Sequence, residues 1–321
     1  MVERNRPPEK VGSDLVKKPE QDERTKDGIY TDAMERALYN GVLSGVSLDG
    51  KRFFYANRLA VKPEIMKTGH HSYPPFRQDW FGCSCCPPNI ARLLASFGTY
   101  IYSRDTTGIW VNLYAAGSGK CEIGGERITI EQQTAYPWKE KVEITVRTAR
   151  PVDCSLNLRI PHWCRSPSLS VNGQALVLAD ILNKGYAGIR RRWQNGDSIQ
   201  LFLPMPVEVI EAHPFVRHDS GKVALQRGPI VYCLEEADNG KNLERIFLPE
   251  AAEFATCDNP DLLGGVTTIS TEALVRDLDG WEDTLYRPAK PAFSKKRITA
   301  VPYYAWANRL QGEMLVWMNR K

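Results

Sequence analysis

The sequence predicts an α+β chain of several domains, in which a short helical segment precedes two β-rich domains. Apolar residues recur at helical spacing near residues 32–42 and again near 87–98. After about residue 100 the chain changes into short runs rich in β-branched and aromatic residues. Turn dipeptides such as Asn172-Gly173 and Asn195-Gly196 separate these runs. Many short strands with such turns are typical of antiparallel β-sandwiches.

Composition sets the class of protein and excludes several partners. The chain has 321 residues, of which 42% are hydrophobic and 25% charged, as is ordinary for a globular protein of two or three domains. The net charge is only +4, and no concentrated Lys/Arg stripe supports a nucleic-acid partner. No apolar run reaches the ~18 residues of a membrane span. We therefore expect no nucleic-acid and no membrane partner.

Eight cysteines and the N-terminal composition indicate the compartment. The opening stretch "MVERNRPPEKVGSD" lacks the apolar core of a secretory signal. Eight cysteines in 321 residues are too sparse for a disulfide framework. These observations predict thiols in a reducing compartment and a cytoplasmic location.

Residues 1–28 differ from the rest of the chain. Beside Met1 they contain four aliphatic residues, against seven Lys/Arg and seven Asp/Glu. Such a segment buries too little apolar surface to offset the entropy lost on ordering. We expect it to be a disordered leader.

Ordered structure is predicted from about residue 29 to residue 102. Asp32 and Glu35 have capping-box spacing, and the helix they would open has a stop signal between Gly41 and Gly45. Asp49-Gly50 between two β-prone runs predicts a hairpin. A second helix follows the cysteines, with prolines in its first turn and Gly98 as its stop.

The β-rich remainder divides into two predicted domains, residues 103–207 and 208–321. Nine strand-like runs lie between residues 100 and 212, from "YIYSR" to "VEVIEA". The strand pattern then resumes with "KVALQRGPIVYCLEE" and ends in "RITAVPYYAW" and "EMLVWM". We place the boundary in the proline-containing stretch 204–214.

The stretch "FGCSCCPPN", residues 81–89, is the principal candidate site. Cys83, Cys85 and Cys86 occupy three of four positions just before the second predicted helix. Adjacent cysteines pair poorly as a disulfide, yet both can bind one soft metal ion such as zinc. A helix N-terminus also favours thiolates, so we expect the Cys85 thiol to be more acidic than an ordinary cysteine.

The spacing alone leaves three interpretations open. These cysteines suit a zinc site, a nucleophile, or plain core packing, since free cysteine is among the most buried residue types. The stretch lacks the distant second pair that makes a structural zinc motif strong. Weaker candidates, which exposed loops or solvated strand ends explain equally well, are Glu64, His70, His71, Glu235, Glu236, Asp277 and Asp279.

Several motifs together carry a family resemblance. The stretch "RQDWFGCSCCPPNIARLLASFGTYIY" resembles the signature of glycoside hydrolase family 127, the β-L-arabinofuranosidases. Other segments resemble that family in the same order: "MERALYNGVLSG", "RFFYANRL", "GIWVNLY", "ALQRGPIVYCLE" and "PYYAWANR". The similarity extends from about Ile29 to the C-terminus.

The resemblance implies a fold and a mechanism. Family members have an (α/α)6 barrel followed by two β-sandwich domains, so residues 29–102 would be the C-terminal remnant of the barrel. They release non-reducing-end β-L-arabinofuranosyl units with retention, using a zinc-bound cysteine nucleophile and a glutamate acid/base. The matching positions make Cys85 the nucleophile and Cys86 a zinc ligand. Cys83 has no role in the family motif and is a further candidate ligand.

The sequence departs from the family pattern upstream of the cysteines. The family's remaining zinc ligands, a Glu-x-Cys pair, belong near residues 7–9, which here read Pro7, Pro8 and Glu9. No cysteine precedes Cys83, and the acid/base glutamate would lie before Met1. We therefore expect a truncated or misjoined product, an incomplete zinc site and weak or absent hydrolysis by this chain alone.

Three functions follow from these observations. The first is a glycosidase of the β-L-arabinofuranosidase type, acting on an arabinofuranosyl oligosaccharide or glycoconjugate with zinc as cofactor. The second is a non-catalytic β-sandwich module that binds carbohydrate or supports assembly, and the third is a structural zinc-binding protein. All three are compatible with a homo-oligomer.

Overall fold

The computed structural model describes residues 26–66, 74–83, 85–281 and 284–321. The chain divides into two compact units, of which unit 1 holds residues 1–35 and 92–205, and unit 2 holds residues 36–91 and 206–321. Most of the predicted leader, and both His70 and His71, lie outside the described residues. Within those described, no helix has the length and apolar character needed to span a membrane.

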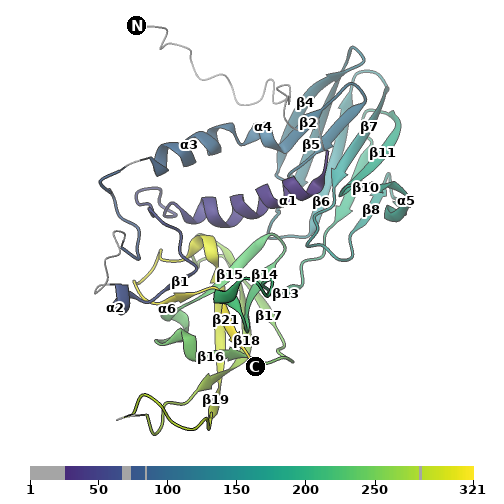
Figure 1. The fold of residues 1–321 in the computed structure, drawn as a ribbon. Helices are drawn as coiled ribbons and strands as arrows, with labels where there is room; N and C mark the ends of the chain where they lie inside the picture. The colour runs from purple at the N-terminus through teal and green to yellow at the C-terminus, as the bar shows by residue number, and fades with distance from the viewer. Residues whose placement is uncertain (1–25, 67–73, 84, 282–283) are drawn as a thin grey trace. The chain divides into compact units, whose positions relative to one another are not determined.

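Unit 1 contains two β-sheets (Figure 1). One sheet has the strand order β10-β11-β7-β3-β2, and the other has the order β4-β5-β6-β12-β8-β9. The strands are β2 (Tyr102–Arg104), β3 (Gly108–Val111), β4 (Gly117–Ile123), β5 (Glu126–Thr134), β6 (Lys141–Thr148), β7 (Val152–Arg159), β8 (Ser168–Val171), β9 (Gln174–Leu176), β10 (Leu182–Asn183), β11 (Tyr186–Trp193) and β12 (Ser198–Phe202). Short helices α4 (Gly98–Ile101) and α5 (Leu178–Ile181) complete it.

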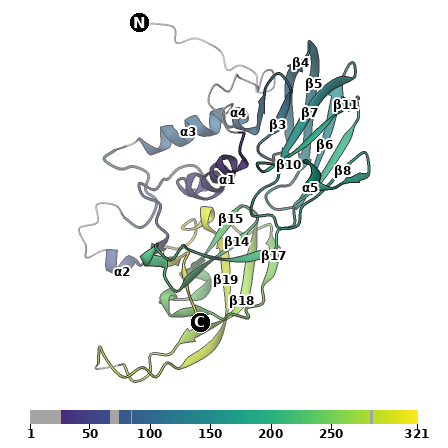
Figure 2. The same cartoon turned by 45° about the vertical axis from the view of Figure 1, so that its right-hand side comes forward.

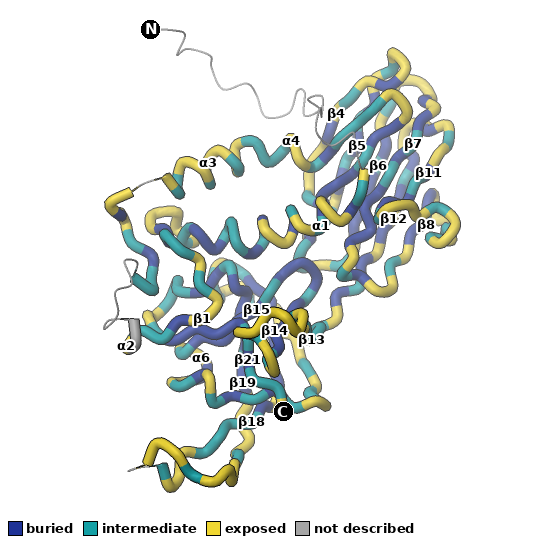
Figure 3. The backbone as a smooth tube through the Cα atoms, in the orientation of Figure 1, coloured by how far each residue is buried: buried dark blue, intermediate teal, exposed yellow. Residues whose placement is uncertain are grey.

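Alternating burial explains why these runs form two sheets with a shared core. In β6, Val142, Ile144 and Val146 are each 0% exposed while the residues between them are only partly buried, as the colours of Figure 3 show for the unit. The Tyr102 hydroxyl of one sheet accepts a hydrogen bond from Gln132 of the other, 2.8 Å away. The two inner faces therefore meet directly.

The predicted capping box at Asp32 and Glu35 is wrong. Helix α1 spans Gly28–Arg36, so Asp32 lies inside it rather than at its start. Both carboxylates instead bind Arg159 of β7, which is fully buried. The two side chains that local spacing assigned to the helix terminus form ion pairs with a distant arginine instead.

The helical part of unit 2 resembles the prediction closely. The helical chain continues as a π-helix, η1 (Ala37–Val42), and ends before Gly45 as expected. The predicted Asp49-Gly50 turn is present, closed by a single bridge between Val46 and Phe53. Helix α3 spans Cys86–Ser96 and passes into unit 1 at Arg92, and Gly98, the expected stop, instead opens the next helix, α4. The remaining elements here are β1 (Ala60–Val61) and α2 (Pro63–Met66).

Hydrogen bonds join the strands of unit 2 into one ten-stranded network. Strand β15 pairs with β14, β19 and β20, so hydrogen bonds connect all the strands. Strands β18 and β19 continue into the long hairpin seen in Figure 2. The strands are β13 (Val207–Glu211), β14 (Lys222–Arg227), β15 (Ile230–Glu235), β16 (Ile246–Leu248), β17 (Ala255–Asn259), β18 (Val266–Arg276), β19 (Phe293–Pro302), β20 (Met314–Leu315) and β21 (Met318–Arg320), besides β1. Helical turns α6 (Glu236–Asn239), η2 (Arg217–Asp219), η3 (Leu243–Arg245) and η4 (Tyr303–Ala305) connect them.

One edge of β18 is shared by two strands that are nearly continuous with each other. Phe247 of β16 pairs with Leu274, and Ala255 of β17 pairs with Ser270. Positions 247 and 255 are eight residues apart, whereas their partners are four apart. The chain between β16 and β17 is therefore four residues too long for a regular strand and leaves the sheet.

Candidate functional site

The thiol cluster, Cys83, Cys85 and Cys86, lies at the start of helix α3 in unit 2. Cys83 and Cys85 are exposed and Cys86 is partly buried. The Sγ atoms of Cys85 and Cys86 are 3.9 Å apart. The Asn89 side chain donates a hydrogen bond to the Cys85 carbonyl oxygen, 2.8 Å away, and so fixes the first turn. The two adjacent thiols are therefore presented together to solvent.

The acidity of the thiols differs from the sequence prediction. The Cys85 backbone N–H donates to Cys83 and lowers the pKa of the Cys83 thiol. Hydrogen bonds with Cys83, and next with Cys86, raise the pKa of the Cys85 thiol. The expectation that Cys85 would be unusually acidic is thus wrong for the three thiols taken alone, because neighbouring sulfurs compete for one negative charge. Cys83 is the first of this pair to ionise.

An aromatic stretch, Phe53-Phe54-Tyr55, lies beside the thiol cluster. The ring centroids of Phe53 and Phe81 are 4.9 Å apart, and Tyr55 and Phe81 are 5.8 Å apart. A hydrogen bond from the Tyr55 side chain contributes to the lowered pKa of Cys83. Phe81 is buried, so the chain two residues before Cys83 is held in the protein interior.

Arg77 holds the N-terminal end of the segment that leads to the cysteines. Its guanidinium donates to the Ser44 carbonyl oxygen at 2.7 Å and to the Trp306 carbonyl oxygen at 2.5 Å. It also lies over the Phe54 ring, 4.4 Å from the centroid. Burial lowers the pKa of Arg77 to about 10. The buried cation is stabilised by these backbone carbonyls and by the nearby Glu235 carboxylate, which opposes the effect of burial.

The cysteine pair fits half of a zinc site. Two thiolates at ~2.3 Å from a tetrahedral zinc would be about 3.8 Å apart, close to the spacing of Cys85 and Cys86. In the described ranges, however, no three His, Cys, Asp or Glu side chains are placed to hold one metal ion. The residues thus suit two of four coordination positions.

The weaker carboxylate candidates have structural partners. Glu235 binds Arg309 at 2.5 Å, and Glu236 accepts a hydrogen bond from the Glu313 backbone N–H at 2.9 Å. Asp277 accepts a hydrogen bond from Ser294 at 3.1 Å, and Glu64 faces Lys241 at 3.5 Å. Each of these four carboxylates thus has a basic, hydroxyl or backbone partner, which is consistent with a structural role.

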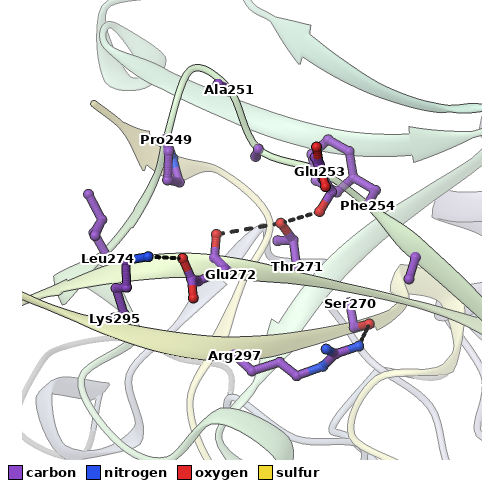
Figure 4. A pocket seen from close by; sticks show the side chains of 12 residues that line it. Pro249, Ala251, Glu253, Phe254, Ser270, Thr271, Glu272, Leu274, Lys295 and Arg297 are labelled. Carbon is purple, nitrogen blue, oxygen red and sulfur yellow. Dashed lines mark hydrogen bonds and ion pairs between the residues drawn. The ribbon is translucent and has the colours of Figure 1, made fainter.

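A second concave region lies where β16 and β17 separate. This groove has a volume of about 610 Å³, within the usual range for small-molecule sites. Figure 4 shows its charged floor, where Lys295 binds Glu272 at 2.7 Å and Arg297 donates to Ser270 at 2.8 Å. The lining comprises Pro249, Ala251, Ala252, Glu253, Phe254, Ala255, Ser270, Thr271, Glu272, Leu274, Lys295 and Arg297.

Sequence reasoning found the thiols but missed the residues that hold them. Tyr55, Arg77 and Phe81 all lie within the quoted family motifs, but the sequence pattern gives none of them a role. Their contacts depend on tertiary approach of residues 53–55 to residues 77–83. A pattern search along the chain does not detect such contacts.

Comparison with known families gives three matches in chain order. Residues 22–99 match "Beta-L-arabinofuranosidase, GH127 catalytic domain", and residues 108–205 match "Beta-L-arabinofuranosidase, GH127 middle domain". Residues 207–319 match "Glycoside hydrolase family 127 C-terminal domain". Together these segments account for most of the chain.

Individual relatives agree with the family matches. The chain is 38% identical over 307 residues to a non-reducing end β-L-arabinofuranosidase of Bifidobacterium longum subsp. longum, covering 91% of this chain and 46% of the relative. A crystal structure of a GH127 β-L-arabinofuranosidase from Geobacillus stearothermophilus T6 matches with TM-score 0.91 and 50% identity, covering 94% of this chain and 47% of that one. A GH127 β-arabinofuranosidase matches with TM-score 0.82 and 35% identity, covering 92% and 46%. The chain thus spans about half the length of these relatives.

Proposed function

The chain belongs to glycoside hydrolase family 127, and on that basis we propose that it carries the nucleophile-bearing part of a retaining β-L-arabinofuranosidase site. Cys85 is the nucleophile, and Cys86 is the neighbouring zinc ligand. The observation that carries the proposal is the 3.9 Å spacing of their sulfur atoms at the start of α3. The substrate class is an arabinofuranosyl oligosaccharide or glycoconjugate.

The reaction proceeds in two displacements at the anomeric carbon. The Cys85 thiolate forms a carbon–sulfur bond while the bond to the leaving oxygen breaks, and a carboxylic acid protonates that oxygen. Water then gives a proton to the carboxylate formed in the first step and attacks the same carbon, and the carbon–sulfur bond breaks to return the thiolate. Two inversions retain the configuration.

Zinc, when bound, keeps a coordinated thiol deprotonated, which the raised pKa of Cys85 makes necessary. Cys85 and Cys86 would hold it, because no third His, Cys, Asp or Glu of the described residues is placed to join them. These residues provide fewer than the four ligands zinc prefers. We therefore expect weak zinc binding by this chain.

Family membership and the cysteine chemistry also support proposals about the fold and the location of the protein. We propose that the two sheets of unit 1 form a β-sandwich, and that α1, η1 and α3 are helices of a partial (α/α)6 barrel. All eight cysteines lie in the described part of the chain and none forms a disulfide there, which supports a reducing, cytoplasmic location.

Zinc content and hydrolysis test the proposal together. After dialysis against a fixed free zinc concentration, Cys85→Ser and Cys86→Ser should each bind at least about tenfold less zinc than wild type, because each removes one of few thiolate ligands. Release of aryl aglycone from an aryl β-L-arabinofuranoside should be near background for the chain alone. Cys257→Ser, at another exposed cysteine of unit 2, is the matched control.

Two results would count against this assignment. One is zinc binding that survives both Cys85→Ser and Cys86→Ser. The other is hydrolysis well above background that is unaffected by Cys85→Ser. Stoichiometric zinc with Cys85-dependent turnover would instead support the nucleophile and contradict the expected weakness of the site.

The groove favours a second candidate, a carbohydrate-binding module. It places the cationic donors Lys295 and Arg297 and the acceptor Glu272 beside the apolar side chain of Phe254. Sugars present alternating hydroxyl and apolar faces, which such a mixed surface can bind. This activity would be independent of the thiols.

Calorimetric titration with arabinan-derived oligosaccharides separates the candidates. If the groove binds sugar, Arg297→Ala should weaken binding about five- to tenfold, the loss of one charged hydrogen bond of ~1–1.5 kcal/mol, while Cys85→Ser leaves it unchanged. Lys241→Ala, at an exposed lysine of the same unit outside the groove, is the control. Absence of measurable binding by wild type removes the module from consideration. Zinc binding without sugar binding or turnover would then favour the third function, a structural zinc protein.

A further inference from the structure

Arg77 is buried without a carboxylate in contact. Its side chain is 5% exposed, and within the described ranges its hydrogen bonds end on the backbone carbonyl oxygens of Ser44, Tyr304 and Trp306. Burying a guanidinium is unfavourable, as the pKa of Arg77 shows. A methionine would fill similar volume without that cost. The retained property is therefore the set of directional N–H donors.

Those donors join three segments that are distant in sequence. Ser44 follows the π-helix η1, whereas Tyr304 and Trp306 follow β19 in the sheet. Phe54 is enclosed between the Arg77 guanidinium, 4.4 Å from its centroid, and the Trp306 ring, stacked at 4.7 Å. Arg77 thus fixes Phe54 as well as its own segment.

The neighbours of Phe54 face the thiol cluster. Phe53 and Tyr55 contact Phe81, and Tyr55 bonds Cys83. Gln78, next to Arg77, forms two backbone hydrogen bonds with Phe53, each 3.0 Å long. The aromatic stretch therefore contacts Arg77 on one side and the segment that carries the cysteines on the other.

We propose that Arg77 is a positioning residue for the thiol cluster, acting through the aromatic stretch Phe53–Tyr55. It ties residues 77–83 to the turn η4 that follows β19, through the carbonyls of Tyr304 and Trp306. The sheet of unit 2 thereby helps to orient Cys83 and Cys85. The consequence for zinc and catalysis rests on the proposed function, whereas the ordering of this segment does not.

Amide hydrogen exchange measures that ordering directly. In Arg77→Met, exchange of the amides in residues 78–86 should accelerate at least roughly tenfold, because the Gln78–Phe53 pairing loses its anchor. Amides of β14 and β18 should remain within about twofold of wild type. Arg77→Lys should be intermediate, since lysine keeps a cation but its donors all lie on one nitrogen, whereas Arg77 reaches separate carbonyls with three nitrogens.

A core variant distinguishes positioning from general loss of stability. Leu248→Ala, in the hydrophobic core of the same unit, makes no contact with the thiol segment and should accelerate exchange in the sheet as much as in residues 78–86. The proposal is overturned if Arg77→Met exchanges like wild type, or if it accelerates all of unit 2 as Leu248→Ala does.

Zinc affinity, measured by competition with a chelator, connects the ordering to the site. Arg77→Met should weaken zinc binding about tenfold or more, as loss of support around ligands does elsewhere, and Leu248→Ala should not. Zinc binding that withstands Arg77→Met despite accelerated exchange overturns the link to the thiols. If wild type itself binds no zinc, the proposed metal site fails while the exchange experiment still decides the role of Arg77.

Discussion

Glu35 illustrates how single residues acquire their roles from tertiary contacts. It is 1% exposed, and its Oε1 binds Arg159 and accepts a hydrogen bond from the Tyr136 hydroxyl at 2.6 Å. Its Oε2 accepts a hydrogen bond from the Trp163 indole at 3.2 Å. Burial is the largest single influence on the Arg159 guanidinium and would lower its pKa, but Glu35, Tyr136, Tyr114 and Asp32 together raise it. Helix α1 is fastened to β7 by this pair.

Removing the charge of Glu35 should therefore destabilise unit 1 strongly. Glu35→Gln leaves a buried guanidinium with one fewer carboxylate, and we expect a loss of about 3–5 kcal/mol in the free energy of unfolding. Urea unfolding followed by tryptophan fluorescence measures it. Asp32→Asn, at the more exposed partner of the same arginine, should lose clearly less. Equal losses in the two variants would contradict the importance given to burial.

At the residue scale, the sequence predicted identities better than environments. The cysteines of "CSCC" were recognisable because rare residue types were concentrated at a helix start. Asp32 and Glu35 were misassigned because capping-box spacing is local, whereas Arg159 is more than 120 residues away. The order of thiol acidity also depends on Tyr55 and on the Cys85 backbone, which spacing does not specify.

Strand β3 pairs with β7 in a parallel arrangement that requires close approach of the two backbones. Gly108 opens β3, and a Cβ added there would lie 2.3 Å from the Ser155 carbonyl oxygen and 2.9 Å from its Cβ. The obstructing oxygen belongs to the backbone, so it cannot rotate away. Gly108 is thus needed for the β3–β7 pairing.

Gly108→Ala should therefore cost about 1–3 kcal/mol of unfolding free energy, as overpacking of a rigid contact does. Gly188→Ala, on the opposite neighbour of β7, is the matched control. Its added Cβ would meet the Asn157 side-chain oxygen at 3.1 Å, which can move, so its cost should be below about 1 kcal/mol. Denaturant midpoints of the two variants provide the comparison, and a larger loss for Gly188→Ala would refute the backbone argument.

At the element scale, periodicity located most strands and both main helices but not how they combine. Alternation identified β5, β6 and β7 because one face of each is buried. Strand β4 was missed because "GSGKCEI" contains two glycines and little alternation. The sequence did not indicate which strands of unit 2 pair, since pairings such as β16 with β21 are decided by approach between distant segments.

Buried tyrosines in both units set the alkaline limit of the whole molecule. Burial raises the pKa values of Tyr102 in unit 1 and of Tyr303 and Tyr304 in unit 2 to about 12. In the unfolded chain these groups ionise near pH 10. Their contribution to stability is complete below about pH 10 and is lost as pH rises through about 12.

We expect the free energy of unfolding to fall steeply between about pH 10 and pH 12. Each such tyrosine contributes a slope of up to ~1.4 kcal/mol per pH unit. Tyr102→Phe should reduce the slope by the contribution of one tyrosine. It should also lower the free energy of unfolding at neutral pH slightly, because the hydrogen bond with Gln132 is lost. Urea unfolding at a series of pH values measures this slope. An unchanged slope in Tyr102→Phe would show that its hydroxyl already ionises in the folded chain.

At the scale of the whole molecule, the motifs predicted family and order of segments together. They did so because the quoted stretches follow one another in the same order as in the family. A single motif carries no information about that order. The division into units was not predictable in the same way. Residues 28–35 belong with strands of residues 102–202, while the thiol cluster belongs with the C-terminal sheet. Only tertiary contacts decide such membership.

The interruption between β16 and β17 gives this protein a surface where substitutions can occur with little loss of stability. The floor below it, from β18 and β19, is fixed by the ladder pairing Ser270 to Arg276 with Phe293 to Thr299. The six residues 249–254 stand outside that ladder, and Thr271 holds them through the Glu253 carbonyl, a group every amino acid supplies. The exposed side chains of Glu250, Ala251 and Glu253 can change without shifting the register underneath, whereas Ala252 and Phe254 pack against the hydrophobic core. New ligand preferences can therefore arise at this position while the thiol segment and its anchors stay as they are.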